Sequence, residues 1–248
     1  MDLQLPLFFS MFLFVYTFAY SVLLRNWGPK HRLEASSCFI SLAHGTPVVI
    51  LATIAILQSP NPTDFAAPNT KFQALVLEYS IAYFSLDLLH CVSFSPNDFV
   101  FIFHHLAVLY VFVTCNYIVG CGAVPILGLL VVAELSSGCQ NAWTLAGYRR
   151  TEIVAAAKFE EFVTPYFLTF YSVLRVGLAP VVVCKMGEFY VGSLVMGGNL
   201  IPTWAWISWL CVIGMAIFGS VLWVGNHWLL WFRPTKNRKE KVSSHVSH

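Results

Sequence analysis

The sequence carries little charge. Asp, Glu, Lys and Arg account for 10% of its 248 residues, whereas hydrophobic residues account for 58% and the mean hydropathy is +0.70. A soluble globular domain typically has about 25% charged residues, which keep its surface hydrated. The scarcity of charge therefore argues against an ordinary soluble domain and predicts an integral membrane protein. The formal net charge of +2 is too small to indicate a nucleic-acid-binding protein.

Several chemical signatures are also lacking. The seven cysteines are scattered singly without a Cys-x-x-Cys pair, so neither a disulfide framework nor a zinc-finger site is predicted. The chain has no P-loop, no dinucleotide-binding fingerprint and no Gly-x-Ser-x-Gly element. Its eight histidines form no His-x-x-His-His box of the di-iron membrane enzymes. One zinc ion on Asp87, His90 and His105 is geometrically conceivable, but the sequence favours neither a metal nor a cofactor.

Long apolar runs, by contrast, are abundant. About 20 apolar residues cross the hydrocarbon core as a helix, and backbone groups there must bond within the segment. Seven runs have this length: 5–24, 36–57, 72–92, 99–119, about 123–145, 159–183 and 202–231. Glu78 and Asp87 interrupt the third run, and the glycine-rich stretch 187–199 is predicted to be a short interfacial or re-entrant piece. The predicted fold class is all-α, a polytopic bundle of about seven spans.

Lysine and arginine are distributed unevenly between the connections, which predicts the orientation. With the N-terminus outside, eleven of the fourteen fall on the cytoplasmic side. They are Arg25, Lys30, Arg32, Arg149, Arg150, Lys158, Arg233, Lys236, Arg238, Lys239 and Lys241. Because cytoplasmic loops are enriched in these residues, the N-terminus is predicted outside and the C-terminus in the cytoplasm. Basic residues follow the first run and do not precede it, so it is expected to be an uncleaved anchor.

Ionisable and amide side chains gather in the predicted cytoplasmic half of the spans. They are His44, Asp87, His90, His104, His105, Gln140, Asn141, Glu160, Glu161, Asn226 and His227, with Glu134 nearer mid-membrane. Such groups are costly in hydrocarbon and mark functional sites, so a shared polar cavity open toward the cytoplasm is predicted. The alternative is that residues near helix ends reach water individually. This explains Glu160, His90 and His227 well and Asp87, His105 and Glu134 poorly, because Asp and Glu side chains are short.

Spacing suggests specific pairings. Asp87 and His90 lie at i, i+3, so the carboxylate is expected to orient the imidazole. Glu134, Ser137 and Asn141 recur on one helix face and predict a polar stripe.

Two further features concern the direction of single side chains. His104 and His105 point about 100° apart on a helix, so one of them faces a substrate and the other a neighbouring helix. Arg175 is expected to extend outward to the interface. The alternatives are a pair with Glu78 or with a lipid phosphate.

A family resemblance rests on several short motifs in a fixed order. They are Tyr83 to Asp87, Ser95-Pro96-Asn97-Asp98, Phe103-His104-His105, Glu134-Leu135-Ser136-Ser137 and Asn141. This order resembles the TLC domain of translocating-chain-associated proteins, ceramide synthases and several small lipid-homeostasis proteins, and a small plant-type member fits best. The resemblance covers about 33–231. It divides the chain into an anchor span with a basic loop (1–32), a six-span TLC-like domain (33–231) and a basic, disordered cytoplasmic tail (232–248).

The resemblance implies a role for the histidine pair. In ceramide synthases the paired histidines lie in a membrane cavity and take part in acyl transfer from acyl-CoA to a sphingoid amine, and His104 and His105 match that pair. The synthase pattern continues with His-Asp and a second Asp three residues on. Here the corresponding positions are Ala133-Glu134 and Ser137, so the chain resembles the branch that lacks the full synthase motif.

Three functions remain open at this stage. The first is a lipid-homeostasis protein that binds an acyl chain or lipid in the cavity. The second is a ceramide-synthase-like N-acyltransferase that uses acyl-CoA, with His105 as base or acyl acceptor; the third is a cargo or chaperone adaptor of the early secretory pathway. The predicted catalytic residues are His104, His105, Asp87 and Glu134, and the predicted ligand-binding residues are His44, His90, Ser137, Asn141, Glu161 and His227. The family likeness implies the endoplasmic reticulum as the location.

Overall fold

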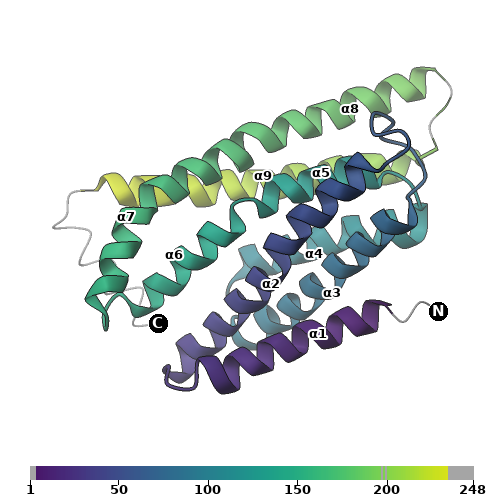
Figure 1. Cartoon of the computed structure of the whole chain (residues 1–248). Coiled ribbons are helices and arrows are strands. Elements are labelled where there is room, and N and C mark those ends of the chain that lie inside the picture. The colour runs from purple at the N-terminus through teal and green to yellow at the C-terminus, as the bar shows by residue number, and fades with distance from the viewer. Residues whose placement is uncertain (1–3, 197, 199, 234–248) are drawn as a thin grey trace.

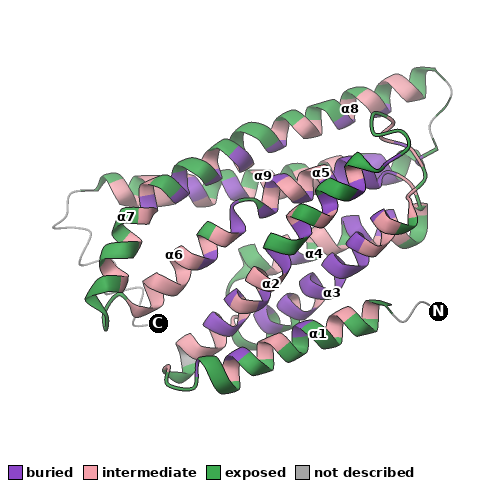
Figure 2. Ribbon diagram, viewed as in Figure 1, coloured by how far each residue is buried: buried purple, intermediate pink, exposed green. Residues whose placement is uncertain are grey.

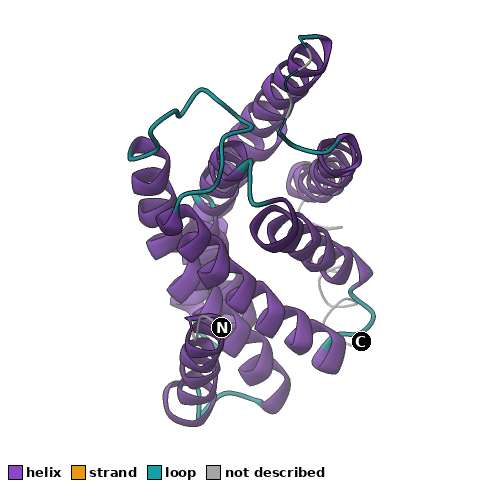
Figure 3. Cartoon of the chain, turned by 90° about the vertical axis from the view of Figure 1, so that its right-hand side faces the viewer, coloured by secondary structure: helices purple, strands orange, loops and turns teal. Residues whose placement is uncertain are grey.

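The computed structural model describes residues 4–196, 198 and 200–233, and these form a bundle of long helices (Figure 1). The helices are α1 (Gln4–Phe18), α2 (Pro29–Leu57), α3 (Lys71–Phe94), α4 (Phe99–Val113), α5 (Ala123–Glu134), α6 (Ser137–Arg149), α7 (Val154–Tyr171), α8 (Ala179–Val195) and α9 (Thr203–Phe232). Three π-helical segments extend them within this part of the chain: η1 (Ala19–Leu23), η2 (Thr114–Val119) and η3 (Ser172–Leu178). Loops make the remaining connections (Figure 3), and the loop between α2 and α3 covers residues 58–70.

The described residues contain seven helical spans long and apolar enough to cross a membrane, which confirms the predicted all-α, polytopic fold class. The first span begins and the last one ends at opposite ends of the bundle, as an odd number of crossings requires (Figure 1). The predicted disordered tail falls largely on 234–248, outside the described residues.

The sixth span differs from the prediction. It runs without interruption from Val154 to Val195 through α7, η3 and α8, so the expectation of a separate interfacial or re-entrant piece over 187–199 was wrong. Met186 and Tyr190 lie at i, i+4 and are fully buried, and α8 packs along α9. Burial of this face maintains the helix past Gly187.

The fifth span is also not one regular helix. It is divided into α5 and α6 by a break at Leu135 and Ser136. The Ser136 hydroxyl donates to the Ala133 carbonyl at 3.2 Å, a local bond that competes with the helical ladder. Glu134 therefore ends one helix and Ser137 begins the next.

Helix α3 lies at the centre of the bundle and explains why a span with two carboxylates is viable. It contacts α1, α2, α4 and α5, and 72% of its most apolar window is buried. Figure 2 shows it mostly as buried, whereas α1, α8 and the outer turns of α9 are largely exposed. Asp87 therefore meets protein and not lipid, in agreement with the rule that charged groups in membrane spans face the bundle interior.

The end of the bundle formed by the loop before α3 and the turn before α5 is closed by hydrogen bonds. The Asn69 side chain donates to the Cys115 carbonyl at 3.0 Å and accepts from the Ala123 amide at 2.9 Å. Gly122 adopts a left-handed backbone (φ 89°), and a Cβ there would lie 2.9 Å from Ile201, so only glycine suits this turn. The opposite end, where α2 begins and α3 ends, holds the cavity mouth described next.

Candidate functional site

A cavity of about 780 Å³ opens between the helices at that end of the bundle. Its walls come from α2, α3, α4, α5, α6, α7, η3 and α9. The ionisable side chains on its lining are Glu34, Asp87, His90, Asp98, His104, His105, Glu134 and Arg175, with Cys38, Cys91, Tyr83, Tyr110, Tyr148 and Tyr171 as weaker acids. Polar groups from separate spans are therefore brought together within one space.

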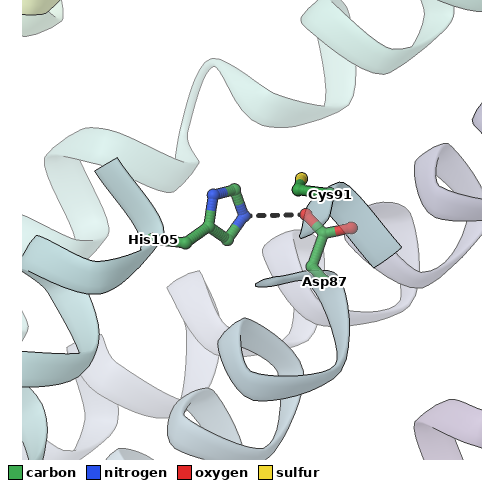
Figure 4. A group of neighbouring side chains, drawn as sticks. All are labelled: Asp87, Cys91 and His105. Carbon is green, nitrogen blue, oxygen red and sulfur yellow. Dashed lines mark hydrogen bonds and ion pairs between the residues drawn. The ribbon is translucent and has the colours of Figure 1, made fainter. Parts of the chain in front are cut away.

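Asp87 and His105 form the most tightly connected pair on the wall. His105 Nε2 lies 2.8 Å from Asp87 Oδ2 (Figure 4). Ser37 Oγ donates to Asp87 Oδ1 at 2.5 Å. His105 Nδ1 lies 2.7 Å from the carbonyl oxygen of Phe101. A carbonyl only accepts, so Nδ1 carries a proton and Nε2 is the nitrogen engaged by the carboxyl group. Both ring nitrogens of His105 are therefore occupied, and neither is free to act as a base or an acyl acceptor.

Cys91 completes a group with this pair. One ligand atom each of Asp87, Cys91 and His105 lies within 4.8 Å of the others (Figure 4). Asp87 and Cys91 share one face of α3 at i, i+4, and His105 approaches from α4. An Asp–Cys–His set with an open fourth position is compatible with zinc, but the hydrogen bond satisfies the buried carboxylate and imidazole without one.

His90 does not take the place predicted for it. Its Nδ1 lies 3.0 Å from the Tyr16 hydroxyl of α1. Asp87 bonds instead to His105 and Ser37, so the predicted Asp87–His90 pair is not formed. His90 still lines the cavity.

His104 is the imidazole that faces the open space. It lines the cavity and also a second, mainly apolar pocket of about 100 Å³. Its ring plane stands nearly perpendicular to that of His105, at 88°. Within the described part of the chain its nitrogens have no hydrogen-bond partner, so His104 and not His105 has nitrogen lone pairs or protons available to a ligand.

Glu134, Ser137 and Asn141 all line the cavity, as the predicted stripe requires, although the helix break lies between the first two. Asn141 Nδ2 donates to Ser41 Oγ at 2.8 Å and to the Ser137 carbonyl at 2.9 Å. Glu134 Oε2 lies against α2 at Gly45, where a Cβ would approach it to 2.9 Å. Gly45 therefore makes room for the carboxylate, a role that the sequence analysis missed.

Three of the predicted ligand-binding residues do not line the cavity. His44 is fully buried, stacks on Tyr83 at 4.1 Å between ring centroids, and lies 3.1 Å from Ser80 Oγ through Nε2. His227 stacks on Trp223, and Glu161 is exposed on the outer face of α7. His44 contacts the site only indirectly, since its Nδ1 lies 3.9 Å from Glu134 Oε2.

Arg175 points inward, so the expected extension to the outer interface was wrong. Its Nη2 donates to the Ala133 carbonyl at 2.9 Å, and its guanidinium lies 5.3 Å from the centroid of the Tyr171 ring. Arg175 lines both the cavity and the apolar pocket. The predicted span 159–183 put Arg175 eight residues from its outer end, whereas the helix continues to Val195, so the inward direction of Arg175 had no clear signal in the sequence.

Comparison with known proteins identifies the family. A family model described as the TLC domain matches residues 34–228. The chain belongs to the TLC domain family. It is also 48% identical over 245 residues to the TLC domain-containing protein At5g14285 of Arabidopsis thaliana, which covers 98% of this chain and 95% of that protein. No solved structure matches the chain.

The TLC domain match agrees closely with the region of resemblance read from the sequence, 33–231, and confirms that reading. It includes every residue named above as part of the cavity lining. The cavity is thus built from TLC domain residues, and α1 packs against the domain from outside the match.

Proposed function

We propose that this TLC protein serves membrane lipid homeostasis by binding an acyl chain or a lipid in its intramembrane cavity. One observation carries the proposal: the main cavity, which combines largely apolar walls with a cluster of ionisable groups, shares a wall with the smaller apolar pocket, and this wall includes His104, Glu134 and Arg175. A lipid has the same division between a polar head and an apolar chain. Ligand sites of this size typically combine apolar walls with a few polar groups that fix orientation.

The proposal includes a sidedness and a location. The cavity mouth, at Glu34, Ser95 and Tyr148, lies beside the connections that carry most of the lysine and arginine. The positive-inside rule places that end in the cytoplasm. An acyl chain or lipid would then reach the polar groups from the cytoplasmic side or leaflet, in the endoplasmic reticulum as the family likeness suggests.

Filling the cavity tests the proposal. Gly219 lines it from α9, and a Cβ at this position meets nothing within 4 Å, so Gly219→Phe should occupy the space without a clash. Gly214→Phe is the matched control, since Gly214 lies on α9, is exposed, is equally open and does not line the cavity. Purified proteins should be compared by mass spectrometry of retained lipid.

We expect the wild type and Gly214→Phe to retain the same lipid at similar amounts and Gly219→Phe to lose most of it. The proposal is wrong if the wild type carries nothing beyond bulk membrane lipid. Undiminished retention by Gly219→Phe would equally reject the cavity as the binding site.

The accessible imidazole of His104 favours a second candidate, an N-acyltransferase. In this reaction the acyl–sulfur bond of acyl-CoA breaks and an acyl–nitrogen bond to a sphingoid amine forms. A neutral His104 would accept the amine proton as a base, or would first take the acyl group on nitrogen, and CoA would leave as the thiol. His105, with both nitrogens engaged, would position the helix and not react.

The test supplies acyl-CoA and a sphingoid base to the purified wild type, His104→Ala and the His104→Ala/His105→Ala double variant. If the protein is an enzyme, His104→Ala alone should lower the rate to that of the double variant. No N-acyl product above the double variant would remove this candidate and leave lipid binding untouched.

A further inference from the structure

Arg175 lies too deep for its charge to reach water along the helix surface. It is about 20 residues from each end of the 42-residue helix 154–195. This helix is about twice as long as the ~30 Å hydrocarbon core is thick, so Arg175 is central in the helix although the helix ends do not mark the membrane surfaces. Its partner carbonyl, Ala133, is likewise an interior residue of the span 123–149. An arginine side chain can extend to water at the membrane interface when it lies near a helix end. This guanidinium is farther from the helix ends, so its hydrogen-bond partners and counter-ions must come from inside the bundle.

The described residues do not supply a close counter-ion. No carboxylate among them lies within 4.0 Å of Arg175; the Asp87 carboxylate is paired with His105, and Glu134 Oε2 faces His44 at 3.9 Å. Glu134 is near enough to attract Arg175 but forms no ion pair with it. One N–H group donates to Ala133, and Nε is buried without a partner.

A permanent cation in this position is unfavourable unless an anion binds next to it, because only close pairing with an opposite charge offsets the free energy lost on desolvation. Arginine is always charged, so it cannot avoid the cost by losing its proton. The space beside the guanidinium is the cavity, and the missing anion can therefore enter from there.

The position of Arg175 also fits a head-and-tail ligand. The apolar pocket that it borders is lined by aliphatic residues of α4, α5 and α9, among them Val108, Leu129 and Ile213. A chain in that pocket would present its polar end to Arg175 and His104, which border both spaces.

We propose that Arg175 recognises the anionic headgroup of the acyl amphiphile that the cavity binds, as a carboxylate or a phosphate monoester. This rests on the proposed function and narrows its ligand class. Guanidinium pairs with both groups through charge-assisted hydrogen bonds, whereas a neutral or cationic headgroup would leave the arginine without an anion in direct contact.

The experiment compares matched charged and neutral ligands on the full chain in neutral detergent by native mass spectrometry. One arm uses oleate against methyl oleate, and the other uses oleoyl lysophosphatidate against monoolein. The variants are Arg175→Gln, Arg175→Lys and the control Lys185→Gln, which removes an exposed cation from α8 outside the cavity. The oleate and lysophosphatidate arms show which anion is preferred.

We expect the wild type and Lys185→Gln to prefer an anionic ligand over its neutral counterpart by about tenfold to a hundredfold, the usual effect of a hydrogen bond to a charged group. Arg175→Gln should lose that preference while retaining the neutral ligand, and Arg175→Lys should keep part of it. Equal binding of charged and neutral ligands by the wild type would overturn the inference, even if Arg175→Gln fails to fold.

The two proposals fail differently. If the wild type binds oleate and methyl oleate equally and Gly219→Phe abolishes both, the cavity is a lipid site but Arg175 does not read the headgroup. If no amphiphile binds to the wild type in either arm, the proposed function fails together with this inference.

Discussion

His105 approaches Asp87 through Nε2 at 2.8 Å while its Nδ1 is held by the Phe101 carbonyl at 2.7 Å. The carbonyl fixes the ring orientation from within α4, and the carboxylate fixes it from α3. This pair therefore joins two helices on the cavity wall, and the neighbouring His104 is left to face the cavity.

Removal of one member of the pair should destabilise the protein. Asp87→Asn leaves the imidazole without its carboxylate, and His105→Ala leaves the carboxylate without its imidazole. Removal of one partner of a buried ion pair lowers the free energy of unfolding by about 3–5 kcal/mol. Thermal unfolding in detergent of the two single variants and the double variant forms a mutant cycle. The double variant should be much more stable than the sum of the single effects predicts; additivity within about 0.5 kcal/mol would show that the two side chains are not coupled.

His104 should respond differently from its neighbour. Its nitrogens bond to no described residue and its side chain is half-buried on the cavity wall, so His104→Ala should change the free energy of unfolding by about 1 kcal/mol or less. Lipid retention should fall in the same variant. A loss of stability as large as that of His105→Ala, with lipid retained, would assign His104 a structural role instead.

The family, the seven spans and the convergence of polar groups were predictable from the sequence because hydrocarbon imposes strong, local rules on composition. The partners within the cavity were not. Asp87 has a histidine three residues away on its own helix, but the tertiary packing of α3 against α4 brings His105 to it instead. The direction of the Arg175 side chain was predicted wrongly for a related reason. The sequence shows how far along a helix a residue lies, but not which face of the helix meets lipid.

The π-helical segment η3 and the break before Ser137 were also beyond the sequence analysis. Both lie where the cavity is lined, at Arg175 and Glu134, and such irregular turns are often found at functional sites. Glycine gave an ambiguous signal: the glycine-rich stretch 187–199 was predicted to be a short interfacial or re-entrant piece, yet Gly187 lies inside α8. In both cases the packing between helices determines the local backbone structure, and this packing cannot be predicted from a single sequence.

Gly45 should be intolerant of even one added methyl group. A Cβ there would lie 2.9 Å from Glu134 Oε2 and 3.3 Å from Ser137 Cβ, so Gly45→Ala should cost about 1–3 kcal/mol as an overpacked site. The control is Gly138→Ala, where a Cβ meets nothing within 4 Å and the gain in helix propensity should stabilise by up to about 1 kcal/mol. Thermal unfolding measures both. Glu134→Ala should restore part of the stability that Gly45→Ala loses. Equal changes in stability for Gly45→Ala and Gly138→Ala would contradict the close approach of Glu134 to Gly45.

The sidedness is open to a direct experiment in sealed microsomes. Seven crossings would put the two termini on opposite sides of the bilayer, and the lysine and arginine bias predicts that the cavity mouth faces the cytoplasm. An N-glycosylation acceptor added through a linker before Met1 should therefore be glycosylated, and the same tag after His248 should not be. A protease added outside the microsomes should remove an epitope after His248 and spare one before Met1, with detergent permeabilisation as the control that exposes both. The reverse pattern would turn the cavity toward the lumen and remove direct access from cytoplasmic acyl-CoA, whereas tags on the same side would contradict an odd number of crossings.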